Sequence, residues 1–209
     1  MTKTAPAPAP TGSGRVNQKK RTHAAIVQAA AELSRTGREV TMPEIAKAAL
    51  VSEATAYRYF PDLASLLREA IADQLPDPAQ ALAQATDSDD PVERVAAAAN
   101  YLMRHVLARQ GVVRAMIAAT VARPGHPAAR PGLRIGLIDA ALEPLAGSLG
   151  TADPAALSHL KLGLSAIVSP EALFTLTDLH GLDTEEAVSV IVHTACALTR
   201  SAMMATPSS

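Results

Sequence analysis

Apolar side chains recur at helical spacing through most of the chain, with three- and four-residue intervals. Ile26, Ala29, Ala30 and Leu33 form the first such stripe. No segment shows the alternation of apolar and polar residues that is typical of a strand. The pattern therefore predicts an all-α protein, with later helices over residues 63–75, 92–109, 112–122, 133–149, 157–178 and 184–203.

Two short helices joined by a tight turn are predicted between residues 41 and 60. Thr41 and Glu44 have the spacing of a capping box, in which each side chain bonds the other residue's backbone N–H. Val40 and Ile45 are placed to form the hydrophobic staple that accompanies such a cap. Ser52 is a good N-cap for the second helix. This layout is typical of a helix-turn-helix, whose second helix enters the major groove of DNA.

A helical wheel separates the roles of residues on the second helix. Ala56 and Phe60 share one face and are expected to pack inward. Ala54, Thr55 and Arg58 fall on the opposite face, and Tyr57 and Tyr59 flank the inward one. Hydroxyls and a guanidinium on a free face suit phosphate oxygens and base edges. The second helix is therefore predicted to contact DNA.

The order and spacing of these residues resemble the DNA-binding domain of the tetracycline-repressor (TetR) family over roughly residues 20–72. The resemblance implies an N-terminal three-helix DNA-binding domain and a C-terminal helical domain for ligand binding and dimerisation. It implies phosphate contacts by Thr41, Thr55, Tyr57 and Tyr59. It places near base edges Met42, Glu53, Ala54 and Arg58, and Ser52 completes the predicted DNA-binding set.

Two positions depart from the family pattern. Leu50 occupies the turn position where the family usually has Gly, so a positive φ there is expected to cost free energy. Leu63 stands where the family usually has a phosphate-binding Lys. Both departures suggest an adjusted contact with DNA rather than a lost one.

Charge is distributed unevenly along the chain. Residues 1–60 contain nine Lys or Arg and four Glu, a net charge of +5, and residues 61–209 contain ten basic and sixteen acidic residues, a net charge of −6. A near-neutral total thus hides a basic N-terminal third, as expected when one end meets a polyanion. Lys19, Lys20 and Arg21, with Arg15, are placed to follow the DNA backbone or to form a solvated helix start.

Composition divides the chain into a disordered tail over residues 1–14, a DNA-binding domain over 15–62 and an effector-binding and dimerisation domain over 63–206. The Ala-Pro tail has nothing to bury and is no signal peptide. No stretch approaches 18 uninterrupted apolar residues, so no membrane span is expected. Cys196 stands alone in the chain, which excludes an internal disulfide and fits a reducing cytoplasm.

The last two predicted helices, over residues 157–178 and 184–203, carry more apolar surface than packing on one body requires. Such a surplus suggests a partner surface, although it could also belong to the core of the monomer. The resemblance implies a four-helix bundle with a second copy. A two-fold dimer would bind a palindromic operator in double-stranded DNA. Pro170 is expected to kink the first of these helices, and Thr184 to cap the second.

The resemblance also implies an effector pocket in the body. The body has only two aromatic residues and no Trp, so an aliphatic or amphipathic effector is favoured over a flat cationic one. For each candidate, a place in the core or on the surface is favoured over a place in the pocket, and Arg104 and Arg109 are expected to face water. The candidate pocket residues are Tyr101, Met103, His105, Met116, Glu171, Phe174 and Asp178.

These features predict a sequence-specific regulator of transcription, a repressor released by a small molecule. The alternative is a constitutive or architectural DNA-binding protein without an effector. A weaker alternative is a protein whose N-terminal domain only tethers it to DNA while its C-terminal domain binds another protein. Catalysis is not expected. The chain has no nucleophile elbow, phosphate-binding glycine loop or metal-ligand spacing, so neither a cofactor nor a metal is predicted.

Overall fold

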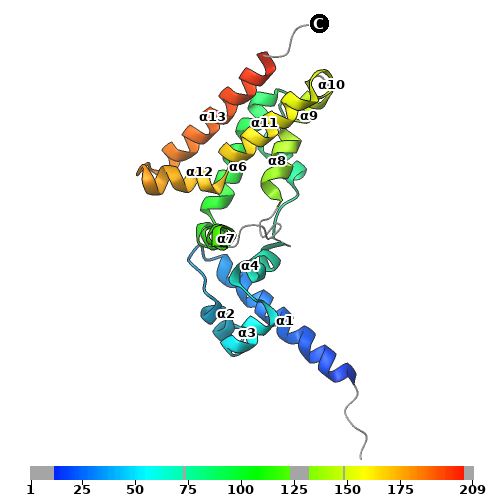
Figure 1. The fold of residues 1–209 in the computed structure, drawn as a ribbon, viewed down its shortest axis with the longest axis vertical. Helices are drawn as coiled ribbons and strands as arrows, with labels where there is room; N and C mark the ends of the chain where they lie inside the picture. Colours follow the sequence, from blue (N-terminus) through cyan, green and yellow to red (C-terminus); the bar gives the residue numbers. More distant parts are fainter. Residues whose placement is uncertain (1–11, 73, 123–131, 148, 205–209) are drawn as a thin grey trace, which may run out of the picture.

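The computed structural model describes residues 12–72, 74–122, 132–147 and 149–204. These residues form helices and connecting turns, and no β-strand occurs among them. The all-α prediction is confirmed. Helices α1 to α4 lie at one end of an elongated molecule, and α11 and α13 lie at the other (Figure 1). We call the first end the head and the second the body.

The head contains α1 (Gly12–Ser34), α2 (Met42–Ala48), α3 (Glu53–Tyr59) and α4 (Leu63–Ala72). Helix α1 packs along α4, and α2 contacts both α1 and α3. The expected tail over residues 1–14 lies outside the described residues up to position 11, and α1 already begins at Gly12. Helix α4 ends at Ala72, three residues before the predicted end.

The body begins with α5 (Pro78–Ala85), α6 (Pro91–Leu107) and α7 (Gln110–Ala122). Helix α5 was absent from the sequence-based prediction. Its signal was nevertheless present, because the Asp77 carboxylate accepts a hydrogen bond from the Gln80 backbone N–H at 2.9 Å and Pro78 occupies the first turn. Helix α5 packs against α6 and α8.

The single helix predicted over residues 133–149 is three short helices: α8 (Leu133–Ala141), α9 (Glu143–Ala146) and α10 (Leu149–Ala152). Pro144 lies in the first turn of α9, where its missing N–H costs little. Inside a continuous helix the same residue would break a backbone hydrogen bond. The apolar periodicity continues through the break, which explains why it was overlooked.

The helix predicted over residues 157–178 is also interrupted rather than kinked. Helix α11 (Pro154–Ile167) ends before Ser169, whose hydroxyl accepts from the Ala172 N–H and caps α12 (Pro170–Phe174). The chain continues as a π-helical turn, η1 (Thr175–Leu179). The prediction of a kink at Pro170 was wrong because Pro170 begins a helix here.

Helix α13 (Thr184–Met204) completes the body and packs along α6 and α11. Its cap is Asp183 and not Thr184, since the Asp183 carboxylate accepts from the Glu186 N–H at 2.8 Å. The cap is one residue earlier than predicted.

Two hydrophobic cores follow one another along the molecule. The head core is built from α1 to α4 but also contains Val112 and Met116 of α7. The body core is built from α5, α6 and the helices from α8 to α13 with their connections. Helix α7 therefore lies at the junction of head and body, as Figure 1 shows. A movement of α7 relative to α6 would therefore displace side chains of the head core.

Two apolar segments of the body, Pro154–Leu179 and Thr184–Met204, have the length and mean hydropathy (1.2 and 1.3) of membrane-spanning helices. Core helices of water-soluble proteins meet the same criteria, and the first segment is interrupted at Ser169. Only 28% and 33% of their most apolar windows are buried within this chain. Both segments therefore expose apolar surface at the end of the body.

Candidate nucleic-acid interface and the cavity behind it

Helices α2 and α3 form the predicted helix-turn-helix. The capping box that begins α2 is confirmed, with the Thr41 N–H donating to the Glu44 carboxylate at 3.0 Å and the Thr41 hydroxyl accepting from the Glu44 N–H at 3.5 Å. Hydrogen bonds from Thr41 lower the pKa of the Glu44 carboxyl, so it stays ionised. Val40 and Ile45 are both buried beneath the cap.

The turn between the two helices is closed by a Schellman motif. The Leu50 N–H donates to the Lys47 carbonyl at 3.2 Å, and the Val51 N–H donates to the Ala46 carbonyl at 2.9 Å. This geometry places Leu50 at φ 56°, as its position predicted. Its side chain is 92% exposed, so no packing compensates for the left-handed backbone.

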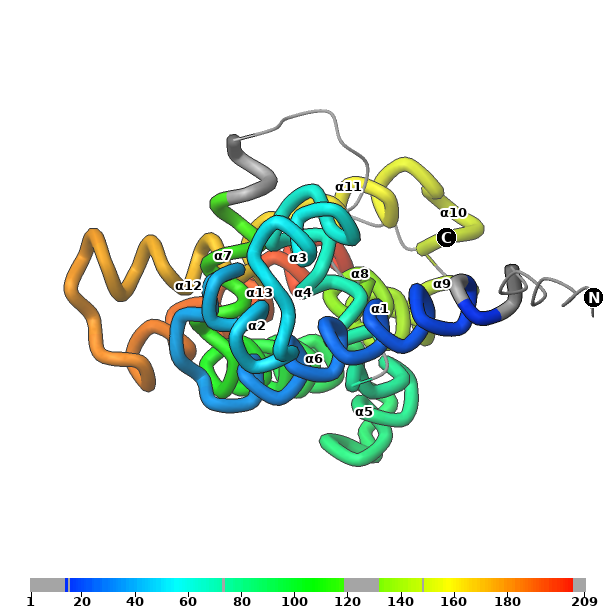
Figure 2. Tube along the Cα trace, turned by 90° about the horizontal axis from the view of Figure 1, so that it is seen from below, coloured from blue at the N-terminus to red at the C-terminus, as the bar shows by residue number. Residues whose placement is uncertain are grey.

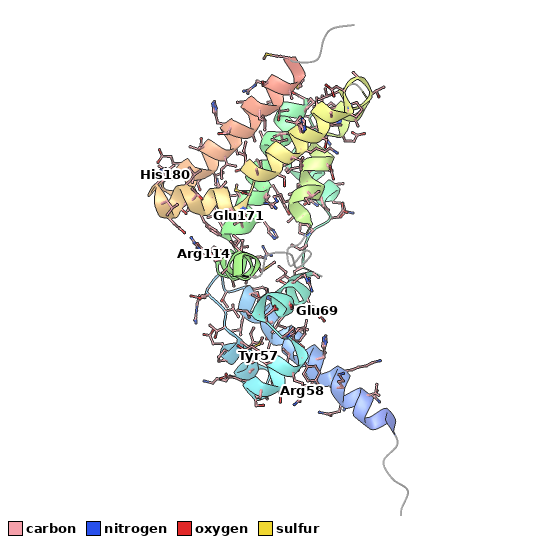
Figure 3. All side chains as sticks on the ribbon, in the orientation of Figure 1. Tyr57, Arg58, Glu69, Arg114, Glu171 and His180 are labelled. Carbon is pink, nitrogen blue, oxygen red and sulfur yellow. The ribbon has the colours of Figure 1, made fainter. Side chains whose placement is uncertain are left out.

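Helix α3 presents one face to the head core and the other outward. Ala56 and Phe60 are buried as predicted. Ser52 caps the helix, since its hydroxyl accepts from the Thr55 N–H at 3.2 Å. Figure 2, seen from the head end, shows α2 and α3 in front with α1 extending past them. Tyr57 and Arg58 lie at this end of the molecule (Figure 3).

A groove of about 370 Å³ runs between α1 and the end of α3, lined by Gln18, Lys19, Arg58 and Tyr59. Two cations converge there, and the Arg58 guanidinium lies 5.8 Å from the Tyr59 ring centroid. Like charges brought together on a surface favour an anion between them, and phosphate is the anion that DNA supplies. The sequence predicted that Lys19 lies beside DNA but not that it lines the same groove as Arg58.

His23 fixes the inner side of this interface. Its ring centroid lies 4.9 Å from that of Phe60, and its Nε2 lies 3.4 Å from the Glu69 carboxylate of α4. The end of α3 is thereby held against both α1 and α4. His23 of α1 thus contacts both the residue that ends α3 and a side chain of α4.

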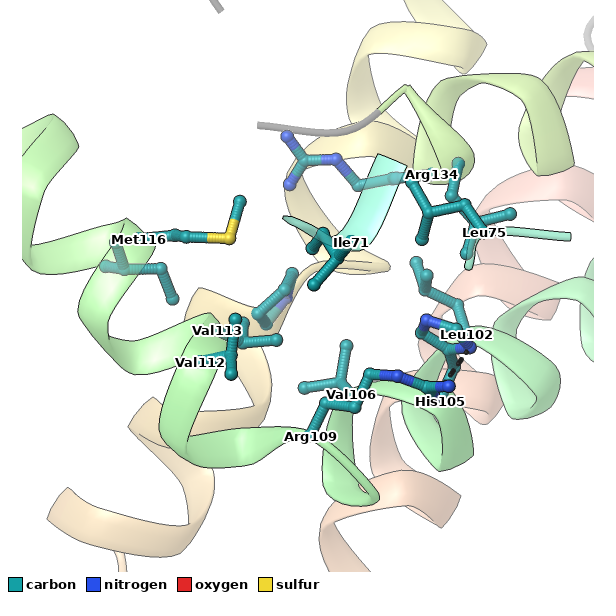
Figure 4. A pocket seen from close by; sticks show the side chains of 13 residues that line it. Ile71, Leu75, Leu102, His105, Val106, Arg109, Val112, Val113, Met116 and Arg134 are labelled. Atoms are coloured by element: carbon teal, nitrogen blue, oxygen red, sulfur yellow. Dashed lines mark hydrogen bonds between the residues drawn. The ribbon is translucent and has the colours of Figure 1, made fainter. Parts of the chain in front are cut away.

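Behind the head, an apolar cavity of about 90 Å³ lies between α4, α6, α7 and α8 (Figure 4). Ile71, Val112 and Met116 belong to the head core, and Leu102 and Leu133 belong to the body core. The cavity therefore opens where the two cores meet. Its lining is Ile71, Leu75, Leu102, His105, Val106, Arg109, Val112, Val113, Met116, Ile117, Leu133, Arg134 and Pro170.

The sequence profile described as "Bacterial regulatory proteins, tetR family" matches residues 25–70, which span α1 to α4. A crystal structure of a TetR transcriptional regulator from Rhodococcus sp. RHA1 superimposes with a TM-score of 0.52 at 25% sequence identity. The superposition covers 87% of this chain and 96% of that one. Residues 25–70 thus match the DNA-binding domain of the TetR family, and the chain as a whole resembles a TetR regulator in fold. No curated protein matches it.

The match to the TetR family implies DNA-binding regulation of transcription. Most of the predicted DNA-binding residues lie on the outer surface of the helix-turn-helix. Thr55 and Tyr59 are half-buried there. The exposed members are Thr41, Ser52, Glu53, Ala54, Tyr57 and Arg58.

Two residues of this TetR head differ from the sequence-based interpretation. Met42 is only 3% exposed and packs into the head core, so its predicted position near base edges is wrong. An apolar side chain in the first turn of α2 gains more from burial than from a polar groove. Leu63, at the start of α4, packs against the same core. It contributes packing where the family usually has a phosphate-binding cation.

The TetR body brings only two of the predicted pocket residues, His105 and Met116, into the cavity. Tyr101 stacks on His105 with ring centroids 6.4 Å apart and packs against the body core. Met103 is fully buried. These side chains are distributed between the cavity and the core, so helical spacing alone did not distinguish them.

Glu171, Phe174 and Asp178 belong to a separate arrangement. Glu171 lies 3.5 Å from Arg134, and Asp178, in the π-helical turn η1, pairs with Arg114. Phe174 lies beneath the Arg114 guanidinium. These three residues join α8 and α7 to α12 and η1 instead of lining the cavity.

Two arginines change the character of the cavity. Arg104 faces outward and pairs with Glu185, as expected, but Arg109 lines the cavity, so the prediction that it faces water was wrong. Arg134 lines it as well. Neither arginine was predicted to line the cavity, because an Arg near a helix end is expected to be exposed to solvent unless the packing of the neighbouring helices is known.

Proposed function

We propose that this regulator is a cytoplasmic homodimeric repressor, which leaves a palindromic operator when a small molecule occupies the cavity. The observation that carries the proposal is the position of the cavity between the two hydrophobic cores. A ligand larger than the cavity must separate its walls. Since some walls belong to the head and others to the body, ligand entry would shift one against the other.

Helix α7 provides a direct path for that shift. Val112 and Met116 are anchored in the head core, while the Arg114 side chain on the same helix reaches the body. The Arg114 guanidinium lies 3.8 Å from the Phe174 ring centroid and donates to the Asp178 carboxylate at 2.9 Å. Figure 3 shows Arg114 at the junction between head and body. Displacement of α7 would therefore tilt the head relative to the body.

The dimer proposal rests on matching stripes of α11 and α13 that this chain does not cover. Each stripe repeats at intervals of three and four residues, so it forms one helix face. Small side chains dominate both faces and would allow two copies to approach closely. The exposed positions are Ala155, His159, Leu162 and Ala166 on α11, and Val190, Thr194, Ala197 and Ser201 on α13.

A transcription assay tests the repressor role. A reporter is placed under the promoter beside the coding region, and its expression is compared with and without the regulator. We expect expression to rise severalfold when the regulator is removed, and to rise similarly when a cognate small molecule is added. A fall on removal would identify an activator. Repression that no small molecule relieves would favour the constitutive alternative.

A further inference from the structure

We propose that the cavity takes a small amphipathic anion, with a carboxylate bound by Arg109 and an apolar group among the surrounding helices. This inference rests on the proposed function, because it names the chemical class of the effector. It is carried by the charges and contacts of the residues that line the cavity.

The lining carries positive charge and no negative charge. Thirteen described residues line the cavity, and they include Arg109 and Arg134 but no Asp or Glu. The charge of Arg134 is offset from outside the lining, since its guanidinium lies 3.5 Å from the Glu171 carboxylate. Within the described part of the chain, no carboxylate lies at ion-pair distance from Arg109. Among the described residues, the cavity lining therefore retains about one uncompensated positive charge.

The contact between Arg109 and His105 shows where an anion would bind. The Arg109 Nη1 lies 3.4 Å from the His105 Nδ1, and both side chains are half-buried. Arginine only donates, so Nδ1 accepts and the proton of the neutral ring resides on Nε2. Nε2 and the remaining guanidinium N–H groups are then available donors. A carboxylate accepts two parallel hydrogen bonds from a guanidinium, and the ring could supply a third.

The environment of His105 supports a partly buried site with a single positive charge. Burial, and then the neighbouring charge of Arg109, lower the pKa of His105 to about 4. A second positive charge is therefore excluded at neutral pH. A guanidinium next to apolar walls loses hydration that only a hydrogen-bonded counter-charge restores. A monoanion matches this site better than a neutral or cationic ligand.

The apolar part of the ligand is limited by the remaining walls. Figure 4 shows Arg109 and His105 meeting on one side of the cavity, with Ile71 and Met116 farther along it. A volume of about 90 Å³ is smaller than the roughly 150 Å³ of an apolar cavity that holds benzene. A short alkyl chain or single ring would therefore have to part α4 and α7 from α6 and α8. This requirement links binding of the anion to movement of the head.

Calorimetric titration of the full chain with matched acids and alcohols tests the proposal. Octanoate and phenylacetate are compared with octan-1-ol and 2-phenylethanol at pH 7.5. Arg109→Met removes the cation while keeping an apolar chain of similar reach. Arg104→Met is the matched control, because Arg104 lies on the neighbouring helix α6, pairs with Glu185 and does not line the cavity.

We expect at least one acid to bind roughly tenfold or more tightly than its alcohol, as a hydrogen-bonded charge warrants. Arg109→Met should remove that preference and leave alcohol binding within about twofold, whereas Arg104→Met should preserve it. Equal binding of acid and alcohol, a preference unaffected by Arg109→Met, or no binding by either acid would overturn the proposal. The wild-type comparison is decisive even if Arg109→Met fails to fold.

Operator binding separates this inference from the proposed function. If an alcohol binds and weakens operator binding, and neither acid binds more tightly than its alcohol, then the cavity is an effector site but the proposal of an anionic effector is wrong. If an acid binds through Arg109 but leaves operator affinity unchanged, then the cavity binds an anion but ligand binding does not release the protein from its operator.

Discussion

A Cβ atom on Gly111 would lie 2.1 Å from the carbonyl oxygen of Arg38. The first turn of α7 therefore rests directly on the backbone of the segment between α1 and α2. No side chain separates the two segments at this point. Because α2 begins the helix-turn-helix and α7 lines the cavity, this backbone contact joins the helix-turn-helix to a wall of the cavity.

Substitution of Gly111 by Ala should disturb this junction. The clash involves backbone atoms, which cannot rotate away, so we expect a loss of stability of about 1–3 kcal/mol, as for other overpacked sites. Operator affinity should also fall, because Arg38 and the start of α2 must shift. Thermal unfolding and fluorescence anisotropy measure the two effects. Gly147→Ala is the matched control, since nothing lies within 4 Å of its Cβ position. Equal behaviour of the two variants would contradict the proposed junction.

Leu50 offers a change in the opposite direction. A non-glycine residue in the left-handed region costs roughly 1–2 kcal/mol, and Leu50 has φ 56° with an exposed side chain. Leu50→Gly should stabilise the protein by about 1 kcal/mol after the greater unfolded-state entropy of Gly is included. Chemical denaturation measures the gain. Leu50→Ala is the control, because it shortens the side chain but keeps the backbone cost. If both variants gain equally, the strain is not in the backbone.

The helix-turn-helix was predictable from sequence because its signals are local. Caps, a staple and an inward face at 56 and 60 all lie within twenty residues. The breaks at Pro144 and Ser169 were missed because apolar periodicity continues across them. The cavity was harder still, since Arg109 becomes a lining residue only through the packing of α4, α7 and α8 around it. Such relations depend on contacts between distant segments.

Stability should depend on pH through His105. Its pKa is about 4 in the folded protein, where burial and Arg109 disfavour the charged form, against about 6.5 in an unfolded chain. The unfolded chain therefore binds the proton first, and stability falls as pH decreases from about 6.5 toward 4. At pH 5 the contribution lost should be about 1 kcal/mol after allowance for partial exposure.

His105→Gln removes this titration and should flatten the decline in free energy of unfolding between pH 7 and pH 5. His193→Gln is the control, since His193 lies exposed on α13. Denaturant titrations at fixed ionic strength compare the three proteins. A decline that is the same in all three would show that His105 is not the responsible group.

Dimerisation should depend on the exposed face of α11. Leu162 is 65% exposed within this chain, and the proposed bundle would bury it against a second copy. Leu162→Glu should then produce a monomer in analytical ultracentrifugation and lower operator affinity by tenfold or more, because an unpaired carboxylate would be buried. Ile135→Glu, at a 58% exposed position on α8, should remain dimeric. A dimeric Leu162→Glu protein would place the interface elsewhere.

Fluorescence anisotropy with the DNA that flanks the coding region tests most directly whether α3 reads a specific operator. Wild-type protein, Arg58→Ala and Tyr57→Phe are titrated at fixed salt, with scrambled DNA and Arg35→Ala as controls. Arg35 follows the end of α1 opposite to Lys19. We expect wild type to prefer a palindromic site by roughly a thousandfold or more. Both α3 variants should weaken this preference, and Arg35→Ala should leave it unchanged. Equal affinity for flanking and scrambled DNA, or α3 variants that bind like wild type, would contradict it.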